Sequence, residues 1–226
     1  MRTIYKGEDM TYIIAIDRPS GSGKSTVSEI LAKKLGIEYL NTGLMYRAVT
    51  KFFLDKGMDE STDDKVLTRM IDDIKIDFKD GRLYLLGSDV TKDLRNDQIT
   101  ANVSWVSAKS YVREKMVDLQ RQIAKNTSFI LDGRDIGSVV FPNAKYKFYL
   151  TASALTRAKR RFDQGESDLS VEEIEKAIIK RDDYDSHREI SPLKVAEGAI
   201  LIDNSELNID QTIDLILSYV EESDVL

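Results

Sequence analysis

The feature that most constrains the fold is a loop of small residues and one lysine, placed between a buried strand and a helix. The loop, residues 20–26 (SGSGKST), follows residues 12–16 (YIIAI). A short continuous apolar run of this kind is typical of a strand buried on both faces. The segment after the loop predicts a helix with a glycine C-cap, from the spacing of Val27, Ile30, Leu31, Leu35 and Gly36.

The loop has the composition of a phosphate-binding loop, or P-loop. Its small residues let successive backbone N–H groups close around a phosphate, and the helix that follows favours negative charge at its N-terminus. Lys24 would reach the β- and γ-phosphates of a nucleotide, and the Ser25 hydroxyl would bind Mg²⁺. The alternative is a flexible loop without a ligand. The residues predicted to bind the donor nucleotide are Ser20, Gly21, Ser22, Gly23, Lys24, Ser25 and Thr26.

The first position of this motif departs from the usual pattern, because Arg18 stands where the P-loop has glycine. A glycine suggests a positive φ, which would strain an arginine. Pro19 argues otherwise, since a residue before proline is pushed toward extended conformations with negative φ. We therefore expect Arg18 to be tolerated, with its guanidinium extended to solvent.

Later segments repeat the alternation of strand and helix. Residues 129–131, 147–150 and 199–202 have the character of buried strands. A helix with Ile209, Ile213, Ile216 and Val220 directed inward is predicted after the last of them. This order predicts an α/β fold with a mainly parallel sheet flanked by helices.

Residues 75–86 (KIDFKDGRLYLL) interrupt this order with two short runs in which apolar and polar residues alternate. Two alternating runs stand on either side of Asp80 and Gly81, and Asp-Gly between such runs predicts a β-hairpin with a type I′ turn. We expect a small antiparallel insertion within a satellite lobe of roughly residues 60–100.

Composition limits the classes of protein and their partners. The 226 residues suffice for one sizeable domain, and 42% hydrophobic with 32% charged residues is ordinary for a globular chain. The net charge of −6 argues against nucleic acid as the main partner. No apolar run approaches the ~20 residues that span a bilayer. Without cysteine, a signal-like N-terminus or a membrane span, the chain is expected in the cytoplasm.

Three arginines indicate how a triphosphate could be neutralised. A P-loop alone does not separate kinases from GTPases, but the guanine-reading Asn-Lys-x-Asp segment of GTPases is absent from this sequence. Arg157, Arg160 and Arg161 fall at i, i+3 and i+4, hence on one helical face. They could belong to a mobile segment that closes over the triphosphate, where phosphoryl transfer needs charge neutralisation. The alternative is a solvated basic face.

Residues 129–135 (FILDGRD) place Asp132 at the end of a buried strand, with Arg134 and Asp135 in the turn that follows. A carboxylate at that position can hold Mg²⁺ or its waters. An acidic turn at a strand end is also common without any function.

A second cluster lies in residues 181–188 (RDDYDSHR). Arg181, Asp185 and Arg188 fall at i, i+4 and i+7 on one helical face, where they form either an anion site or a surface salt bridge. His187 is expected to be a solvated polar residue and not a ligand or a base.

Four segments together resemble the ordered motifs of bacterial cytidylate kinases. They are residues 14–26 (IAIDRPSGSGKST), 41–48 (NTGLMYRA), 132–137 (DGRDIG) and 181–193 (RDDYDSHREISPL). The last two motifs are not shared with adenylate, guanylate or thymidylate kinases, and the resemblance runs from about residue 12 to the C-terminus.

The resemblance implies ATP-dependent phosphorylation of CMP and dCMP, with Mg²⁺, by a monomer. It implies a single P-loop kinase domain of residues 10–226 after an extension of residues 1–9. Within the domain it implies a monophosphate-binding lobe of about residues 41–104, carrying the small sheet, and an arginine-bearing lid of about residues 157–172.

The resemblance also implies roles for single residues. Ser104, Arg113 and Asp135 would surround the cytosine, and Asp185 would meet the ribose. The phosphates would be served mainly by Arg47, Arg134, Arg181 and Arg188, with Thr42 also in the acceptor site. The implied catalytic residues are Lys24, Asp132, Arg134, Arg157 and Arg161; Arg157 also binds ATP, while Ser25 and Asp132 bind the metal.

Two alternative functions are considered, and the first follows from two departures from the family pattern. Asn41 replaces the aspartate that the family usually has before Thr-Gly or Ser-Gly, and Arg18 replaces a glycine. A catalytically weak nucleotide sensor would explain both changes as lost chemistry. Within enzymes, the alternative is a kinase for another small acceptor such as UMP.

Overall fold

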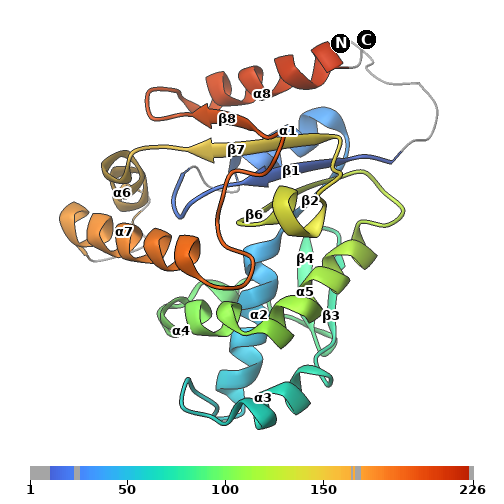
Figure 1. Ribbon diagram of the computed structural model, residues 1–226, viewed down its shortest axis with the longest axis vertical. Helices are drawn as coiled ribbons and strands as arrows, with labels where there is room; N and C mark the ends of the chain where they lie inside the picture. Colours follow the sequence, from blue (N-terminus) through green and yellow to red (C-terminus); the bar gives the residue numbers. More distant parts are fainter. Residues whose placement is uncertain (1–10, 23–25, 164, 166–168, 224–226) are drawn as a thin grey trace. The chain divides into compact units, whose positions relative to one another are not determined.

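The computed structural model describes residues 11–22, 26–163, 165 and 169–223 (Figure 1). Gly23, Lys24 and Ser25 of the predicted P-loop lie outside the described residues. The chain divides into two compact units, one of Met1–Leu40 with Asn126–Leu226 and the other of Asn41–Lys125. Both the first strand and the segments that resemble strands near the C-terminus belong to the larger unit.

The larger unit is built on a five-stranded sheet with the order β2-β6-β1-β7-β8. Strand β1 pairs in parallel with β6 and β7, and β7 pairs in parallel with β8. The predicted α/β fold with a parallel sheet is confirmed, while the short edge strand β2 had no clear sequence signal. The strands are β1 (Ile13–Asp17), β2 (Glu38–Asn41), β6 (Phe129–Gly133), β7 (Tyr146–Thr151) and β8 (Ile200–Asp203).

Helices α1 (Thr26–Leu35) and α8 (Ile209–Ser223) share one hydrophobic core with the sheet. Strand residues such as Ile14 and Phe148 pack in this core with Leu31, Ile213 and Ile216 of the helices. The predicted inward face of the last helix is correct except at its first residue. Ile209 is 47% exposed, because at the first helical position it does not reach the core.

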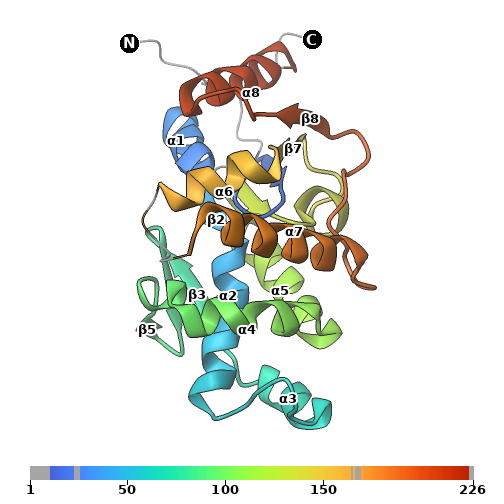
Figure 2. The ribbon, with the colours of Figure 1, turned by 90° about the vertical axis from the view of Figure 1, so that its left-hand side faces the viewer.

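Two further helices of the larger unit, α6 (Ala154–Phe162) and α7 (Val171–His187), pack against each other through a small cluster of Ala158, Ile174 and Ile178 (Figure 2). Ser153 caps the N-terminus of α6. A capping box of Ser170 and Glu173 fixes the start of α7. A single π-helical turn, η2 (Ile136–Val140), follows β6.

The smaller unit contains the predicted hairpin. Strand β3 (Ile76–Lys79) pairs antiparallel with β4 (Arg82–Leu85). Asp80 and Gly81 have φ of 51° and 72°, and positive φ at both central residues is what a type I′ turn requires. A two-residue strand, β5 (Ser88–Asp89), extends the hairpin to a three-stranded sheet that the sequence did not predict.

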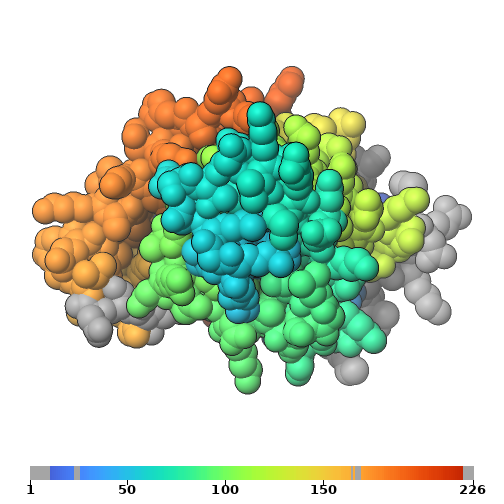
Figure 3. Space-filling model, turned by 90° about the horizontal axis from the view of Figure 1, so that it is seen from below, coloured from blue at the N-terminus to red at the C-terminus, as the bar shows by residue number. Residues whose placement is uncertain are grey.

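Helices complete the smaller unit around its own core, where the rings of Phe53 and Trp105 stack with centroids 6.3 Å apart. Helix α3 covers the end of this unit that faces the viewer in Figure 3. The helices are α2 (Thr42–Asp55), α3 (Asp64–Ile71), the 3₁₀ turn η1 (Asp93–Arg95), α4 (Asp97–Ala108) and α5 (Ser110–Ile123). Within the described parts of the chain, no helix combines the length and the apolar character that crossing a bilayer requires.

Candidate functional site

The first half of the predicted P-loop is packed tightly after β1. Gly21 has a φ of +79°, and a Cβ placed there would lie 3.4 Å from Cβ of Arg157 and 3.5 Å from Cδ1 of Ile178. The buried hydroxyl of Ser22 donates to the backbone oxygen of Pro19 at 3.1 Å. The two distances are ordinary van der Waals contacts, so it is the positive φ that requires glycine at position 21.

Arg18 does not extend to solvent, so that part of our expectation is wrong. Its side chain is 13% exposed, and Nη2 lies 2.5 Å from Oδ2 of Asp132. The Tyr39 hydroxyl donates to the same oxygen at 3.0 Å. Burial alone would lower the pKa of Arg18, but the charges of Asp132 and Tyr39 and the hydrogen bond to Asp132 raise it. A long side chain is accommodated because β6 offers it a buried carboxylate.

The backbone of Arg18 behaves as the following proline predicts. The described non-glycine residues with positive φ are Asp80, Leu86 and Ser191, so Arg18 is not in the strained region. Its N–H donates to the backbone oxygen of Gly133 at 3.1 Å. The loop thus starts in an ordinary conformation despite the loss of glycine.

The fit of Mg²⁺ to this site depends on Asp132, because the described residues contain no group of three or more acidic or histidine side chains that could hold a metal. Mg²⁺ usually keeps several waters and binds through one or two carboxylates together with substrate phosphates. Oδ2 of Asp132 already accepts from Arg18 and Tyr39. The arrangement suits a Mg²⁺ that enters bound to the nucleotide phosphates better than a Mg²⁺ that is held by protein ligands alone.

Asp17, which our sequence analysis did not single out, holds the turn after β6. Its two carboxylate oxygens accept from the N–H groups of Ile136 at 2.6 Å and Gly137 at 2.8 Å. Burial raises the pKa of Asp17 to about 7, and the two N–H donors oppose that rise. A carboxylate at the end of a buried strand was the available signal. Asp17 fixes the turn that presents Arg134 and Asp135.

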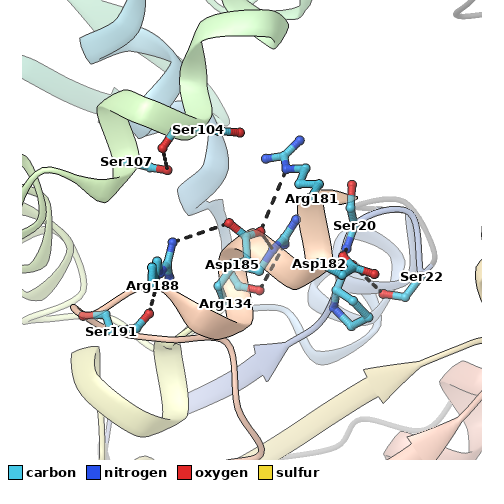
Figure 4. Close-up of polar contacts among 12 residues, drawn as sticks. Ser20, Ser22, Ser104, Ser107, Arg134, Arg181, Asp182, Asp185, Arg188 and Ser191 are labelled. Atoms are coloured by element: carbon cyan, nitrogen blue, oxygen red, sulfur yellow. Dashed lines mark hydrogen bonds and ion pairs between the residues drawn. The ribbon is translucent and has the colours of Figure 1, made fainter. Parts of the chain in front are cut away.

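The densest cluster of charge surrounds Asp185 on α7 (Figure 4). Oδ2 of Asp185 lies 3.0 Å from Nε of Arg134 and 3.9 Å from Nε of Arg181, and Oδ1 lies 3.7 Å from Nη1 of Arg188. The side chain of Asp185 is 5% exposed. Three guanidinium groups that share one carboxylate form a cluster of donors that suits an anionic ligand with several phosphate oxygens.

The three arginines predicted for the lid differ in their surroundings. Arg157 is buried, and its guanidinium donates to the backbone oxygens of Ala152 and Ser20 and to Asp182. Arg160 donates to Asn204 and to the backbone oxygen of Leu207. Arg161 is partly exposed. Like charges at this spacing repel one another, and here the acceptors of Arg157 and Arg160 offset that repulsion.

Two predicted acceptor residues of the smaller unit, Arg47 and Arg113, contact neighbours within that unit. Arg47 on α2 donates to the backbone oxygen of Leu94 at 3.0 Å and to the Thr100 hydroxyl at 2.8 Å. Arg113 on α5 is 2% exposed, and its guanidinium lies 5.2 Å from the ring centroid of Tyr46.

Ser104 and Arg113 are brought together through Ser107. Nη1 of Arg113 donates to the backbone oxygen of Ser107 at 3.0 Å, and the Ser107 hydroxyl donates to the backbone oxygen of Ser104 at 3.0 Å. Thr42 is buried at the first position of α2. These four predicted residues of the smaller unit therefore lie on α2, α4 and α5.

Comparison with known proteins places the chain in a family. The family model described as cytidylate kinase matches residues 14–222. The cytidylate kinase of Lactobacillus johnsonii is 46% identical over 224 residues, covering 96% of this chain and 97% of that protein. The cytidylate kinase of Thermotoga neapolitana is 39% identical over 216 residues, covering 94% and 98%.

A solved structure of a shikimate kinase from Acinetobacter baumannii has a TM-score of 0.52 at 15% identity, with coverage of 96% of this chain and 97% of that chain. At this identity the likeness concerns the fold alone. Because the family model and the relatives extend over nearly the whole length, from the strand before the P-loop to the last helix, the chain belongs to the cytidylate kinase family.

Proposed function

We propose that the protein transfers the γ-phosphoryl group of ATP to CMP and dCMP, giving ADP with CDP or dCDP. The observation that carries this proposal is the cluster of Arg134, Arg181 and Arg188 around Asp185. A nucleoside monophosphate offers that cluster both a phosphate for the guanidinium groups and ribose hydroxyls for the carboxylate. Membership of the cytidylate kinase family supplies the reaction class, with ATP as the phosphoryl donor.

On the donor side, we assign the phosphates of ATP to the loop of residues 20–26 and to Lys24. Arg157 is assigned to the same side because it is bonded to Ser20 of that loop. Arg161 would add charge from the solvent side of α6. When bound, Mg²⁺ would neutralise charge on the transferring phosphoryl group, and Ser25 and Asp132 are the residues that would hold it.

On the acceptor side, we assign Asp185 to the ribose and the surrounding arginines to the phosphate, together with Arg47 and Thr42. The cytosine is assigned to Ser104, Arg113 and Asp135. Cytosine presents an amino donor beside ring acceptors, which a carboxylate and a guanidinium complement. The acceptor phosphate is already an anionic nucleophile, so the reaction needs positioning and charge neutralisation more than a general base.

An acceptor screen tests this proposal. With ATP and Mg²⁺, we expect CMP and dCMP to give the highest kcat/KM among the nucleoside monophosphates in a coupled assay of ADP release. A faster reaction with AMP, GMP or dTMP would overturn the assignment, and a faster reaction with UMP would favour the alternative pyrimidine acceptor. Binding of nucleotides without ADP release above a mock preparation would favour the sensor.

A second prediction concerns the choice of base. Asp135 is 3% exposed at the start of η2. A buried hydrogen-bond acceptor loses its partner when a base with the wrong pattern of donors and acceptors binds. In Asp135→Asn, the ratio of kcat/KM for CMP to that for UMP should fall by at least about tenfold, or ~1.4 kcal/mol. The KM for ATP is the internal control and should change little. An equal loss on the ATP side would contradict the assignment of Asp135 to the base.

A further inference from the structure

Helix α7 carries a second carboxylate, Asp182, which is partly buried and contacts Ser20 at the start of the loop of residues 20–26. Its Oδ1 accepts from the backbone N–H of Ser20 at 3.0 Å. Its Oδ2 lies 2.5 Å from Nη1 of Arg157. The same Nη1 donates to the backbone oxygen of Ser20 at 2.7 Å. Ser20, Arg157 and Asp182 thus close a ring of three contacts, in which Ser20 uses both its backbone donor and its backbone acceptor.

The ring is shielded from solvent, which makes its electrostatic contacts strong and their loss costly. The side chains of Arg157 and Asp182 are 8% and 18% exposed. Nε of Arg157 is also fixed, since it donates to the backbone oxygen of Ala152 at 2.9 Å. Gly21, the residue after Ser20, packs against Arg157 and against Ile178 of α7. The start of the loop is therefore clamped between α6 and α7.

A phosphate-binding loop works by holding its N–H groups in place before the ligand arrives. A loop rich in glycine and serine loses much conformational entropy when it is ordered, so contacts that order it beforehand lower the cost of binding. We propose that Asp182 is a positioning residue for the donor nucleotide, which orders the start of the P-loop through Ser20 and holds Arg157 beside it. This inference rests on the proposed function and assigns a specific residue to its ATP side.

The placement of Asp182 on α7 makes the inference selective. Asp185 is one helical turn further along the same helix, and it contacts the three arginines assigned to the acceptor (Figure 4). One helix thus presents one carboxylate to the donor loop and another to the acceptor cluster. Loss of the Asp182 carboxylate should consequently weaken the binding of ATP and leave the binding of CMP unchanged. A general defect in α7 would weaken the binding of both.

The experiment measures the binding of ATP and of CMP separately, by calorimetry with Mg²⁺ and without turnover, in Asp182→Asn and Asp182→Ala. Asparagine keeps an acceptor for the Ser20 N–H but removes the charge that faces Arg157, whereas alanine removes both. We expect the Kd for ATP to rise about three- to tenfold in Asp182→Asn and further in Asp182→Ala, with the Kd for CMP within about twofold of wild type. The KM for ATP should rise in parallel, with a smaller change in kcat.

Asp183→Asn is the matched control, because its carboxylate lies on the same helix, is 73% exposed and contacts His187 in the next turn. It should bind both nucleotides as the wild type does. An unchanged Kd for ATP in both Asp182 variants, a tighter one, or an equal loss for ATP and CMP would each overturn the inference. Failure of the wild type to phosphorylate CMP would instead contradict the proposed function, since the binding of ATP is read without any acceptor.

Discussion

Replacing Asp185 with alanine should lower kcat/KM for CMP by about 10³-fold or more, a loss of ~4 kcal/mol of transition-state stabilisation. The reason is that the Asp185 carboxylate holds three positively charged side chains in place. Arg134, Arg181 and Arg188 all approach this one carboxylate, at 3.0 to 3.9 Å. Without it, three guanidinium groups repel one another, and their positions for the acceptor phosphate are lost. Removing one partner from a buried, hydrogen-bonded charge pair typically costs about 2–5 kcal/mol.

The measurement is steady-state kinetics, first with CMP varied at saturating ATP and then with ATP varied at saturating CMP. Asp185→Asn keeps the volume and an acceptor oxygen, so its loss should be smaller than that of Asp185→Ala. Asp183→Ala on the same helix controls for helix propensity. Thermal unfolding of each variant separates misfolding from a local defect. If Asp185→Ala were folded and retained CMP turnover within tenfold of wild type, the cluster would not be the acceptor site.

Local signals in the sequence predicted four strands of the parallel sheet with its first and last helices, and the hairpin, because each was encoded within a few neighbouring residues. Helices α2, α3 and α4 of the smaller unit were not predicted from such signals. The apolar run before the P-loop, the helical spacing after it and the Asp80-Gly81 turn are such signals, and the pairing of β3 with β4 confirms the last. The two-residue strand β5 and the edge strand β2 were missed because such short segments have no periodicity to detect. Their place depends on partners elsewhere in the chain.

The contacts of the candidate site depend on residues that are far apart in sequence. Arg18 and Asp132 are separated by 114 positions, and Ser20 and Asp182 by 162. Motifs named the residue types, and family resemblance named many of the positions, but neither indicated that Asp132 is shared by Arg18 and Tyr39. Sequence patterns of this kind report which chemistry is available, while the parallel order of the sheet decides which side chains meet.

Replacing Arg18 with glycine should destabilise the protein, although it restores the usual first letter of the motif. The buried Asp132 would lose its contact with the guanidinium of Arg18, while the Tyr39 hydroxyl would remain beside it. Breaking a buried ion pair from one side costs about 3–5 kcal/mol, and some of this should be recovered here because the carboxylate can attract solvent cations. We expect a net loss of about 2–4 kcal/mol in the free energy of unfolding, measured with urea.

A double-mutant cycle decides whether this loss belongs to the ion pair. Arg18→Met keeps the apolar stem of the side chain, and Asp132→Asn removes the opposite charge. If the two residues interact favourably, the double variant should be destabilised less than the sum of the losses in the two single variants. A second measurement uses the carboxylate of Asp132, which no longer contacts a guanidinium at position 18 in Arg18→Gly. Mg²⁺ alone should raise the melting temperature of Arg18→Gly more than that of the wild type, since a divalent cation can then occupy the place of the guanidinium.

Turnover of the folded fraction should change by less than about tenfold, because Arg18 is unstrained and precedes the residues assigned to the phosphates. A hundredfold rise in activity on Arg18→Gly, with stability unchanged, would show instead that Arg18 had disabled the loop and would favour the nucleotide sensor.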